Sequence, residues 1–158
     1  MSSDKQTLIG ELGTAIMRWQ DQTQKFDELV GHIYGLGPSE RLCLSFLVQG
    51  PQTASAIARE IRLTPAAVTT LLDRLEQRGY VRRRPDPTDR RKVMVKSAAA
   101  ALELVEAVYA PLAIAGAAML DRYDVAELNI VSRVIRDSME IQEKAARELA
   151  ERGEPRSR

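Results

Sequence analysis

Residues 64–79 carry a complete set of helix signals, and they constrain the fold more than any other part of the sequence. Thr64 and Pro65 pair an N-cap hydroxyl with proline at the first helical position, and Gly79 is placed to end the helix. At about 100° per residue, the apolar side chains of this segment form one stripe roughly 100° wide. These side chains are Val68, Leu71, Leu72 and Leu75. The opposite face is small at its start and polar further along, and consists of Ala66, Thr69, Thr70, Asp73, Arg74 and Gln77.

The segments around this helix predict the rest of a compact lobe. Thr53 caps a short preceding helix, and residues 62–63 form the tight turn between the two helices. Two short strands follow, because β-branched residues flank a run of proline, aspartate and threonine that favours a turn. The strands and the turn are expected at residues 80–84, 92–96 and 85–89. The order helix, tight turn, helix and hairpin predicts a winged helix-turn-helix.

Long amphipathic helices are expected on both sides of this lobe. Residues 7–33 repeat apolar side chains at helical spacing, and Ser97 is expected to cap a long alanine-rich helix after the hairpin. Pro111 falls inside that helix and predicts a kink or a local break. Asp124 and Glu127 resemble a capping box that opens a last helix. With 20 Ala, 17 Leu and only 4% aromatic residues, the fold class is mainly α (α+β).

Composition excludes several classes of protein. The sequence shows no run that approaches the ~20 apolar residues of a membrane span, and its first residues are polar. One cysteine and one histidine argue against a disulfide framework, a histidine-based zinc site and a catalytic triad. We also find no glycine-rich phosphate loop and no metal-ligand cluster. The sequence therefore predicts a cytoplasmic protein that is not an enzyme, with no cofactor and no membrane partner.

The positive charge is concentrated in one place. Residues 78–96 carry eight basic and two acidic residues, whereas the segments on either side are mildly acidic and the whole chain has a net charge of +1. Arg outnumbers Lys by 18 to 5, which favours recognition of phosphates or bases. A solvated loop would also be charged, but here the basic hairpin lies beside a polar helix face, and the pair favours nucleic-acid binding. Asp73 would repel phosphates unless Arg74 or another arginine neutralises it.

Residues 53–97 closely resemble the DNA-binding core of the MarR-type (multiple antibiotic resistance regulator) transcription factors. Asp89-Arg90-Arg91 fits the Asp-x-Arg signature of the family's wing. The other matching stretches are residues 56–58, 64–69, 72–76, 79–83 and 86–88. The sequence departs from the family after the wing, where Lys96-Ser97 and alanines replace a Leu-Thr pair followed by glycine.

The resemblance implies a homodimer on a palindromic operator. The single domain over residues 1–158 would comprise a DNA-binding lobe at about 38–96 and dimerisation helices at about 7–33 and 98–150. The resemblance also implies that Arg91 enters the minor groove and that Asp89 orients it. The interface candidates are Leu8, Leu12, Leu128, Val131 and Ile135.

The predicted function is a sequence-specific double-stranded DNA-binding regulator, a homodimeric repressor released by a small aromatic or phenolic effector. The predicted DNA contacts of the recognition helix are Thr64, Pro65, Ala66, Thr69, Thr70 and Arg74, and those of the wing are Arg84, Asp89, Arg90 and Arg91. Arg83 and Arg84 either hold backbone phosphates or pack on the hairpin. No catalytic or metal-binding residue is predicted. The alternative is a winged-helix module that binds protein without binding DNA.

Three further residue types have competing interpretations. Cys43 lies among Leu42, Leu44 and Phe46, where an inert buried thiol is favoured over a redox sensor. His32 is expected at the surface or at a helix end rather than in a ligand pocket. Trp19 and Phe26 are expected in the core or in a dimer interface.

Overall fold

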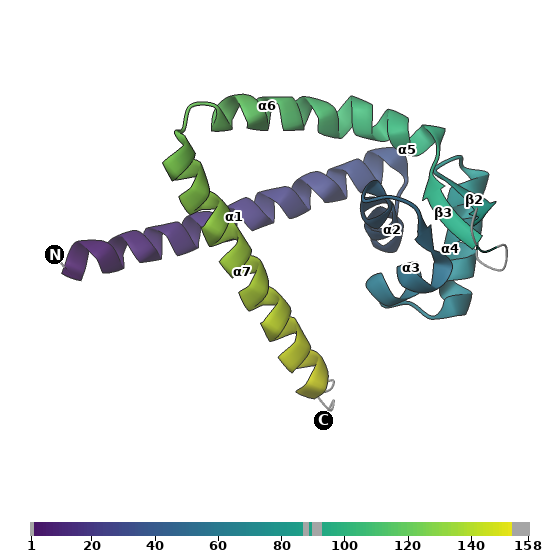
Figure 1. Ribbon diagram of the computed structural model, residues 1–158, viewed down its shortest axis with the longest axis horizontal. Coiled ribbons are helices and arrows are strands. Elements are labelled where there is room, and N and C mark those ends of the chain that lie inside the picture. The colour runs from purple at the N-terminus through teal and green to yellow at the C-terminus, as the bar shows by residue number, and fades with distance from the viewer. Residues whose placement is uncertain (1, 87–88, 90–92, 153–158) are drawn as a thin grey trace. The chain divides into compact units, whose positions relative to one another are not determined.

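The computed structural model describes residues 2–86, 89 and 93–152, which divide into two compact units, Met1–Tyr109 and Ala110–Arg158. Figure 1 shows the elements in chain order. The first unit contains α1 (Ser2–Tyr34), α2 (Pro38–Val48), β1 (Gln52–Thr53), α3 (Ala54–Glu60), α4 (Pro65–Gln77), β2 (Val81–Pro85), β3 (Val93–Ser97), α5 (Ala99–Leu104) and the π-helix η1 (Val105–Tyr109). The second contains α6 (Ala110–Leu120) and α7 (Val125–Arg152). The expected mainly helical fold with a winged helix-turn-helix is confirmed.

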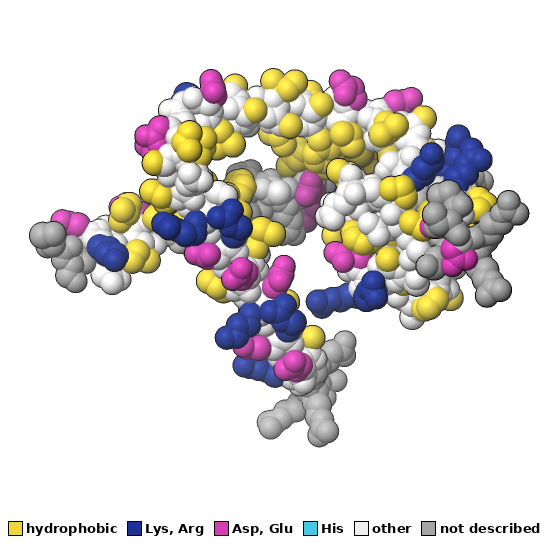
Figure 2. Space-filling model, in the orientation of Figure 1, with side chains coloured by type: hydrophobic (Ala, Val, Ile, Leu, Met, Phe, Trp, Pro, Cys, Tyr) yellow, Lys and Arg dark blue, Asp and Glu magenta, His cyan; other side chains and the backbone are white. Residues whose placement is uncertain are grey.

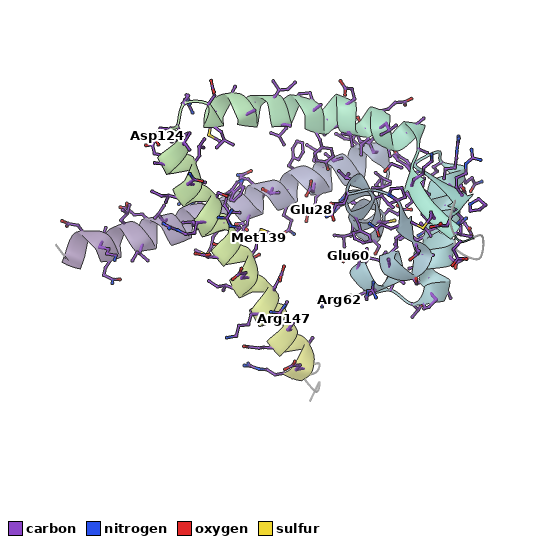
Figure 3. The ribbon with its side chains drawn as sticks, in the orientation of Figure 1. Glu28, Glu60, Arg62, Asp124, Met139 and Arg147 are labelled. Atoms are coloured by element: carbon purple, nitrogen blue, oxygen red, sulfur yellow. The ribbon has the colours of Figure 1, made fainter. Side chains whose placement is uncertain are left out.

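The predicted caps fix the two helices of the helix-turn-helix. Thr53 Oγ1 accepts the Ala56 N–H at 3.1 Å, and Thr64 Oγ1 accepts the Ala67 N–H at 3.3 Å. Gly79 ends α4 with φ +76°, a left-handed conformation that costs glycine no steric strain. The turn between α3 and α4 has Arg62 at φ +54°, where an L-residue with a side chain costs about 1–2 kcal/mol. Figure 3 labels Arg62 at this turn.

The sheet has three antiparallel strands in the order β1-β3-β2. The two predicted strands exist but begin and end one residue later than expected, and β1 was not predicted. Ser97 pairs with Val81 as the last residue of β3, so it does not cap the helix that follows. That prediction was wrong by one residue. The N-cap of α5 is Ala98, whose N–H donates to the Tyr80 carbonyl at 2.9 Å.

The core of the first unit is built around the apolar stripe of α4. Eight side chains of this core have at most 2% of their surface exposed, and they come from α2, α3, α4, β2 and β3. They are Cys43, Ile57, Val68, Leu71, Leu72, Leu75, Val81 and Val95. All four predicted stripe residues of α4 belong to this set. In Figure 1, α4 lies between α3 and the hairpin of β2 and β3, which agrees with its contacts to both.

The predicted break near Pro111 is present as a change in helix type. The π-helix η1 interrupts the helical stretch just before Pro111, which has no N–H to donate to the carbonyl four residues earlier. In η1, the Tyr109 hydroxyl donates to Asp27 Oδ1 at 3.2 Å, and its ring meets Phe26 edge-on at 6.0 Å. Phe26 is therefore half-buried against the core, as expected, whereas Trp19 is 62% exposed and is not part of it.

Helices α6 and α7 have no buried residue in the described part of the second unit. The predicted capping box of α7 is confirmed, because the Asp124 N–H donates to Glu127 Oε2 at 2.9 Å and the Glu127 N–H donates to Asp124 Oδ1 at 2.8 Å. Figure 3 labels Asp124 at the start of this helix.

The helical stretch Ala99–Leu120 corrects one expectation from the sequence. It has 22 residues with a mean hydropathy of 1.5, so its length and composition would suffice to cross a membrane. The sequence pattern concealed this because alanines supply much of the apolar character and Glu103 and Glu106 interrupt it. Only 6% of the apolar 18-residue segment within this stretch is buried inside the chain.

Cys43 should be chemically inert in the folded protein. Its side chain is fully buried, and burial, with a smaller contribution from Glu40, raises the pKa of the thiol to about 11. At pH 8 the thiolate fraction is then on the order of one molecule in a thousand. We expect no labelling by a thiol reagent at pH 8 until the chain is unfolded in denaturant. Rapid stoichiometric labelling of the folded protein would contradict this and would restore the redox-sensor interpretation.

Candidate nucleic-acid interface

The exposed face of α4 carries the predicted base-reading residues. Thr69, Thr70 and Arg74 are accessible, as are Thr64, Pro65 and Ala66 at the start of the helix. The opposite face of the same helix is buried in the core. The structure therefore brings all six predicted residues of the recognition helix onto one accessible surface.

The two threonines of this face present acceptors and methyl groups. Thr69 Oγ1 donates to the Pro65 carbonyl at 3.0 Å, and Thr70 Oγ1 donates to the Ala66 carbonyl at 3.2 Å. Because each hydroxyl proton is engaged within the helix, the outward lone pairs can only accept. Such groups suit the exocyclic amines of adenine or cytosine, and the methyl groups suit thymine.

Arg74 is supported from α2. Its Nε lies 3.8 Å from Glu40 Oε1, and 63% of its side chain is exposed. Glu40 is buried and also accepts the Gly37 N–H at 2.8 Å, which fixes the carboxylate at the start of α2. Glu40 pairs with the Nε of Arg74 while most of the side chain stays exposed, so the guanidinium is suited to contact the edge of a DNA base.

Arg78 ties the end of α4 to the end of α1. Its guanidinium donates to the carbonyls of Tyr34 at 2.6 Å and Gly35 at 2.8 Å, and lies 5.1 Å from the centre of the Tyr80 ring. These carbonyls belong to the C-terminal end of α1, where a cation also favours the helix dipole. His32 lies exposed in the last turn of the same helix, as expected.

Arg83 joins β2 to α4. Its Nη1 lies 2.8 Å from both Asp73 Oδ1 and Glu76 Oε2, and its Nη2 donates to the Thr69 carbonyl at 3.3 Å. Of the two roles predicted for Arg83, the structure shows packing between the hairpin and the helix. The structure also shows which arginine neutralises Asp73, because Arg83, and not Arg74, forms the ion pair with it.

The outer face of the hairpin, here called the cationic face, consists of Arg82, Arg84 and Lys96. All three are exposed, and Arg82 is paired directly opposite Lys96. Figure 2 shows basic side chains gathered over the hairpin. Like charges opposite one another destabilise a sheet, and none of the three has an ion pair among the described residues. The arrangement suits an anionic partner.

A shallow hollow of about 390 Å³ lies on the same side of the hairpin. Its lining combines two members of the cationic face with apolar residues and an aspartate: Pro51, Arg84, Pro85, Asp86, Met94 and Lys96. Of the cationic face, only Arg84 was among the predicted wing contacts. Side chains alternate along a strand, so Arg82 and Arg84 lie on one side of β2 and Arg83 lies on the other. This alternation could have predicted Arg82 as a further wing contact.

The tip of the wing is described only in part. Asp89 is half-buried, and its N–H donates to Asp86 Oδ1 at 2.9 Å. Arg90 and Arg91 lie outside the described residues, so their predicted contacts and the orientation of Arg91 by Asp89 stay predictions.

Comparison with known proteins agrees with this geometry. The model of the MarR family matches residues 46–93, from α2 to the start of β3. The HTH-type transcriptional regulator YcgE of Bacillus subtilis is 29% identical over 90% of this chain and 88% of its own length. A second B. subtilis regulator of this type, YkoM, is 31% identical over 48% of this chain and 50% of its own length. The family model covers 48 of the 158 residues, which include the helix-turn-helix and strand β2.

Solved structures of MarR-type proteins share the fold. A MarR family protein from Bacillus stearothermophilus matches with a TM-score of 0.62 and 19% identity, covering 87% of this chain and 96% of its own. A point mutant of S. aureus MepR, bound to an oligodeoxyribonucleotide, matches with a TM-score of 0.52 and 19% identity over 80% of this chain and 93% of its own. At this level of identity the solved structures show the fold, which this chain shares with a MarR family protein.

Replacement of Arg74 by alanine should relax sequence recognition. We expect a loss of about 1–3 kcal/mol on the preferred DNA site and a weaker preference at one position in each half-site, because one base contact is removed. Competition binding against duplexes altered at single positions measures both effects. Arg18→Ala, which removes an exposed arginine from α1, is the control. An equal loss on every duplex would show that Arg74 contacts only the backbone.

Proposed function

We propose that this chain acts as a MarR-type homodimeric repressor on a palindromic operator, with α4 in the major groove and the wing in the minor groove. The observation that carries the proposal is the division of α4 into two faces. One face is locked in the core, and the other presents Thr69, Thr70 and Arg74 to solvent. A helix of 13 residues with this division can enter a major groove without exposing apolar surface.

The start of α4 is suited to close approach. Pro65 and Ala66 are small. Because Pro65 has no N–H and Thr64 Oγ1 accepts the Ala67 N–H, the Ala66 N–H is the group of this first turn that can donate to a phosphate. Arg74, about two turns further on, has the fork geometry that matches O6 and N7 of guanine. This arrangement supports base contacts from the later part of the helix and phosphate contacts from its beginning.

The wing supplies the second contact in this proposal. Arg84 and the other members of the cationic face would bind backbone phosphates, while Arg91, with Asp89 and Arg90 beside it in sequence, would enter the minor groove. The net charge of +6 over residues 78–96 supports this assignment. An arginine suits the strong negative potential of a narrow, A·T-rich minor groove.

Unpaired apolar surface supports the homodimer. Leu8 and Leu12 of α1 are 55% and 53% exposed, and Val131 and Ile135 of α7 are 43% and 42% exposed. Leu128, the fifth candidate, is partly exposed. Apolar faces of this extent are covered in soluble oligomers, and a second copy of the chain would cover them. The apolar character of residues 99–120 has the same explanation, and a cytoplasmic location follows from the proposed function.

Selection of bound sequences from a random DNA pool tests this function. The full chain should recover a site with two-fold symmetry and half-sites about one helical turn apart. The chain cut after residue 123 keeps the whole core of the first unit but lacks α7. It should sediment as a monomer and recover no symmetric site.

Two results would contradict the proposal. A full-length monomer at micromolar concentration would remove the dimer, and recovery of no sequence by the full chain would favour the protein-binding alternative. The DNA-binding proposal is preferred over that alternative because a protein-binding module has no need of the basic segment.

We propose further that a small aromatic or phenolic effector releases the repressor. The proposal rests on the resemblance to MarR-type regulators and on one structural neighbour. S. aureus MepR bound to ethidium bromide is similar to this chain with a TM-score of 0.57 and 19% identity over 80% of this chain and 91% of its own. An effector shifts an equilibrium only by its differential affinity, so the coupling should be about 1–3 kcal/mol. A panel of phenolic acids that changes neither operator affinity nor melting temperature would count against an effector.

A further inference from the structure

Arg83 lies on the inner side of the hairpin, apart from the other wing arginines. Strand alternation sends Arg82 and Arg84 outward, whereas Arg83 shares its side with the buried Val81. Only 27% of the Arg83 side chain is exposed, compared with 60% for Asp73, its partner on α4. Arg83 is thus the one described wing arginine whose charge is already engaged within the protein.

The contacts of Arg83 leave little capacity for a phosphate. Its guanidinium meets two carboxylates at 2.8 Å and one helix carbonyl at 3.3 Å. To reach a phosphate it would have to leave Asp73 and Glu76, both of which would then stand uncompensated beside the DNA. Such a release would place two free carboxylates beside the phosphates, and juxtaposed like charges disfavour binding.

We infer that Arg83 is a positioning residue for DNA recognition, which neutralises Asp73 and fixes α4 against the wing without touching DNA itself. The inference rests on the proposed function and deepens it. Asp73 shares the exposed face of α4 with the base-reading residues, so its carboxylate faces the same surface as the DNA. Arg83 makes that carboxylate compatible with a polyanion.

The two carboxylates depend on Arg83 to different degrees. Glu76 also accepts the backbone N–H of Arg83 at 2.8 Å, a bond that survives any change of the side chain. Asp73 has no such second bond to the hairpin among the described residues. Loss of the guanidinium therefore releases Asp73 in particular, and Asp73 is where a compensating change should act.

The test is a rescue experiment on a duplex recovered by the selection described above. Arg83→Gln keeps most of the length of the stem and an amide that can hydrogen-bond to Glu76, so the fold is preserved better than with alanine. We expect this variant to bind the duplex about tenfold or more weakly, because a free carboxylate meets the phosphates. Adding Asp73→Asn should recover most of the loss.

A matched control separates a local effect from overall charge. The double variant R83Q/E103Q has the same net charge as R83Q/D73N, but Glu103 lies exposed on α5. Only the Asp73 change should restore binding. The single variant Asp73→Asn completes the cycle, and the salt dependence of binding should keep its slope throughout, because no phosphate contact is lost.

Three outcomes would overturn the inference. If neither double variant recovers and the salt slope falls by about one unit for each lost contact, Arg83 is a phosphate contact. If both double variants recover equally, only overall charge matters. If the variants unfold at lower temperature and no double variant recovers while the slope is unchanged, Arg83 has only a structural role. Failure of the wild-type chain to bind any duplex would instead remove the proposed function together with this role.

Discussion

The burial of one face of α4 is the constraint on which the recognition surface depends. Val68, Leu71, Leu72 and Leu75 are at most 2% exposed, and each buried aliphatic side chain contributes roughly 1.5–3 kcal/mol to the hydrophobic free energy. Rotation of α4 about its axis would expose these side chains and bury polar ones. The rotational setting of the helix is therefore fixed before DNA is present, and with it the residues that can face a groove.

Polar contacts add to the core in fixing α4 relative to α1, α2 and the wing. Glu40 lies beside Arg74 from α2, Arg83 joins α4 to the wing, and Arg78 joins the end of α4 to the last turn of α1. Each contact involves a charged group held by at least two partners, so none relies on a lone surface ion pair, which would contribute little. The bond from Arg78 also means that a displacement of the end of α1 acts directly on the recognition helix. In a dimer built on α1, this is a physical route from the interface to the DNA.

Local signals explain which parts of the structure the sequence could predict. The caps Thr53 and Thr64 and the stripe of α4 depend on neighbouring residues, and all were found. Strand β1 has two residues and no pattern of its own, and Ser97 lost its capping role because β3 continues through it. The partners of Arg83 could not be predicted from the sequence, because they depend on how β2 packs on α4. The wing contacts Arg90 and Arg91 rest on the family resemblance.

The most direct test of this account is the salt dependence of binding to two duplexes of equal length, one with the selected palindrome and one with the same bases scrambled. The account predicts that affinity for both falls steeply with salt and that the palindrome binds about a thousandfold or more tightly. A variant with Arg82, Arg84 and Lys96 changed to glutamine should lose affinity for both duplexes alike and show a shallower slope. Binding that is independent of salt, or equal for the two duplexes, would contradict the central claim that the exposed face of α4 and the basic wing together read DNA.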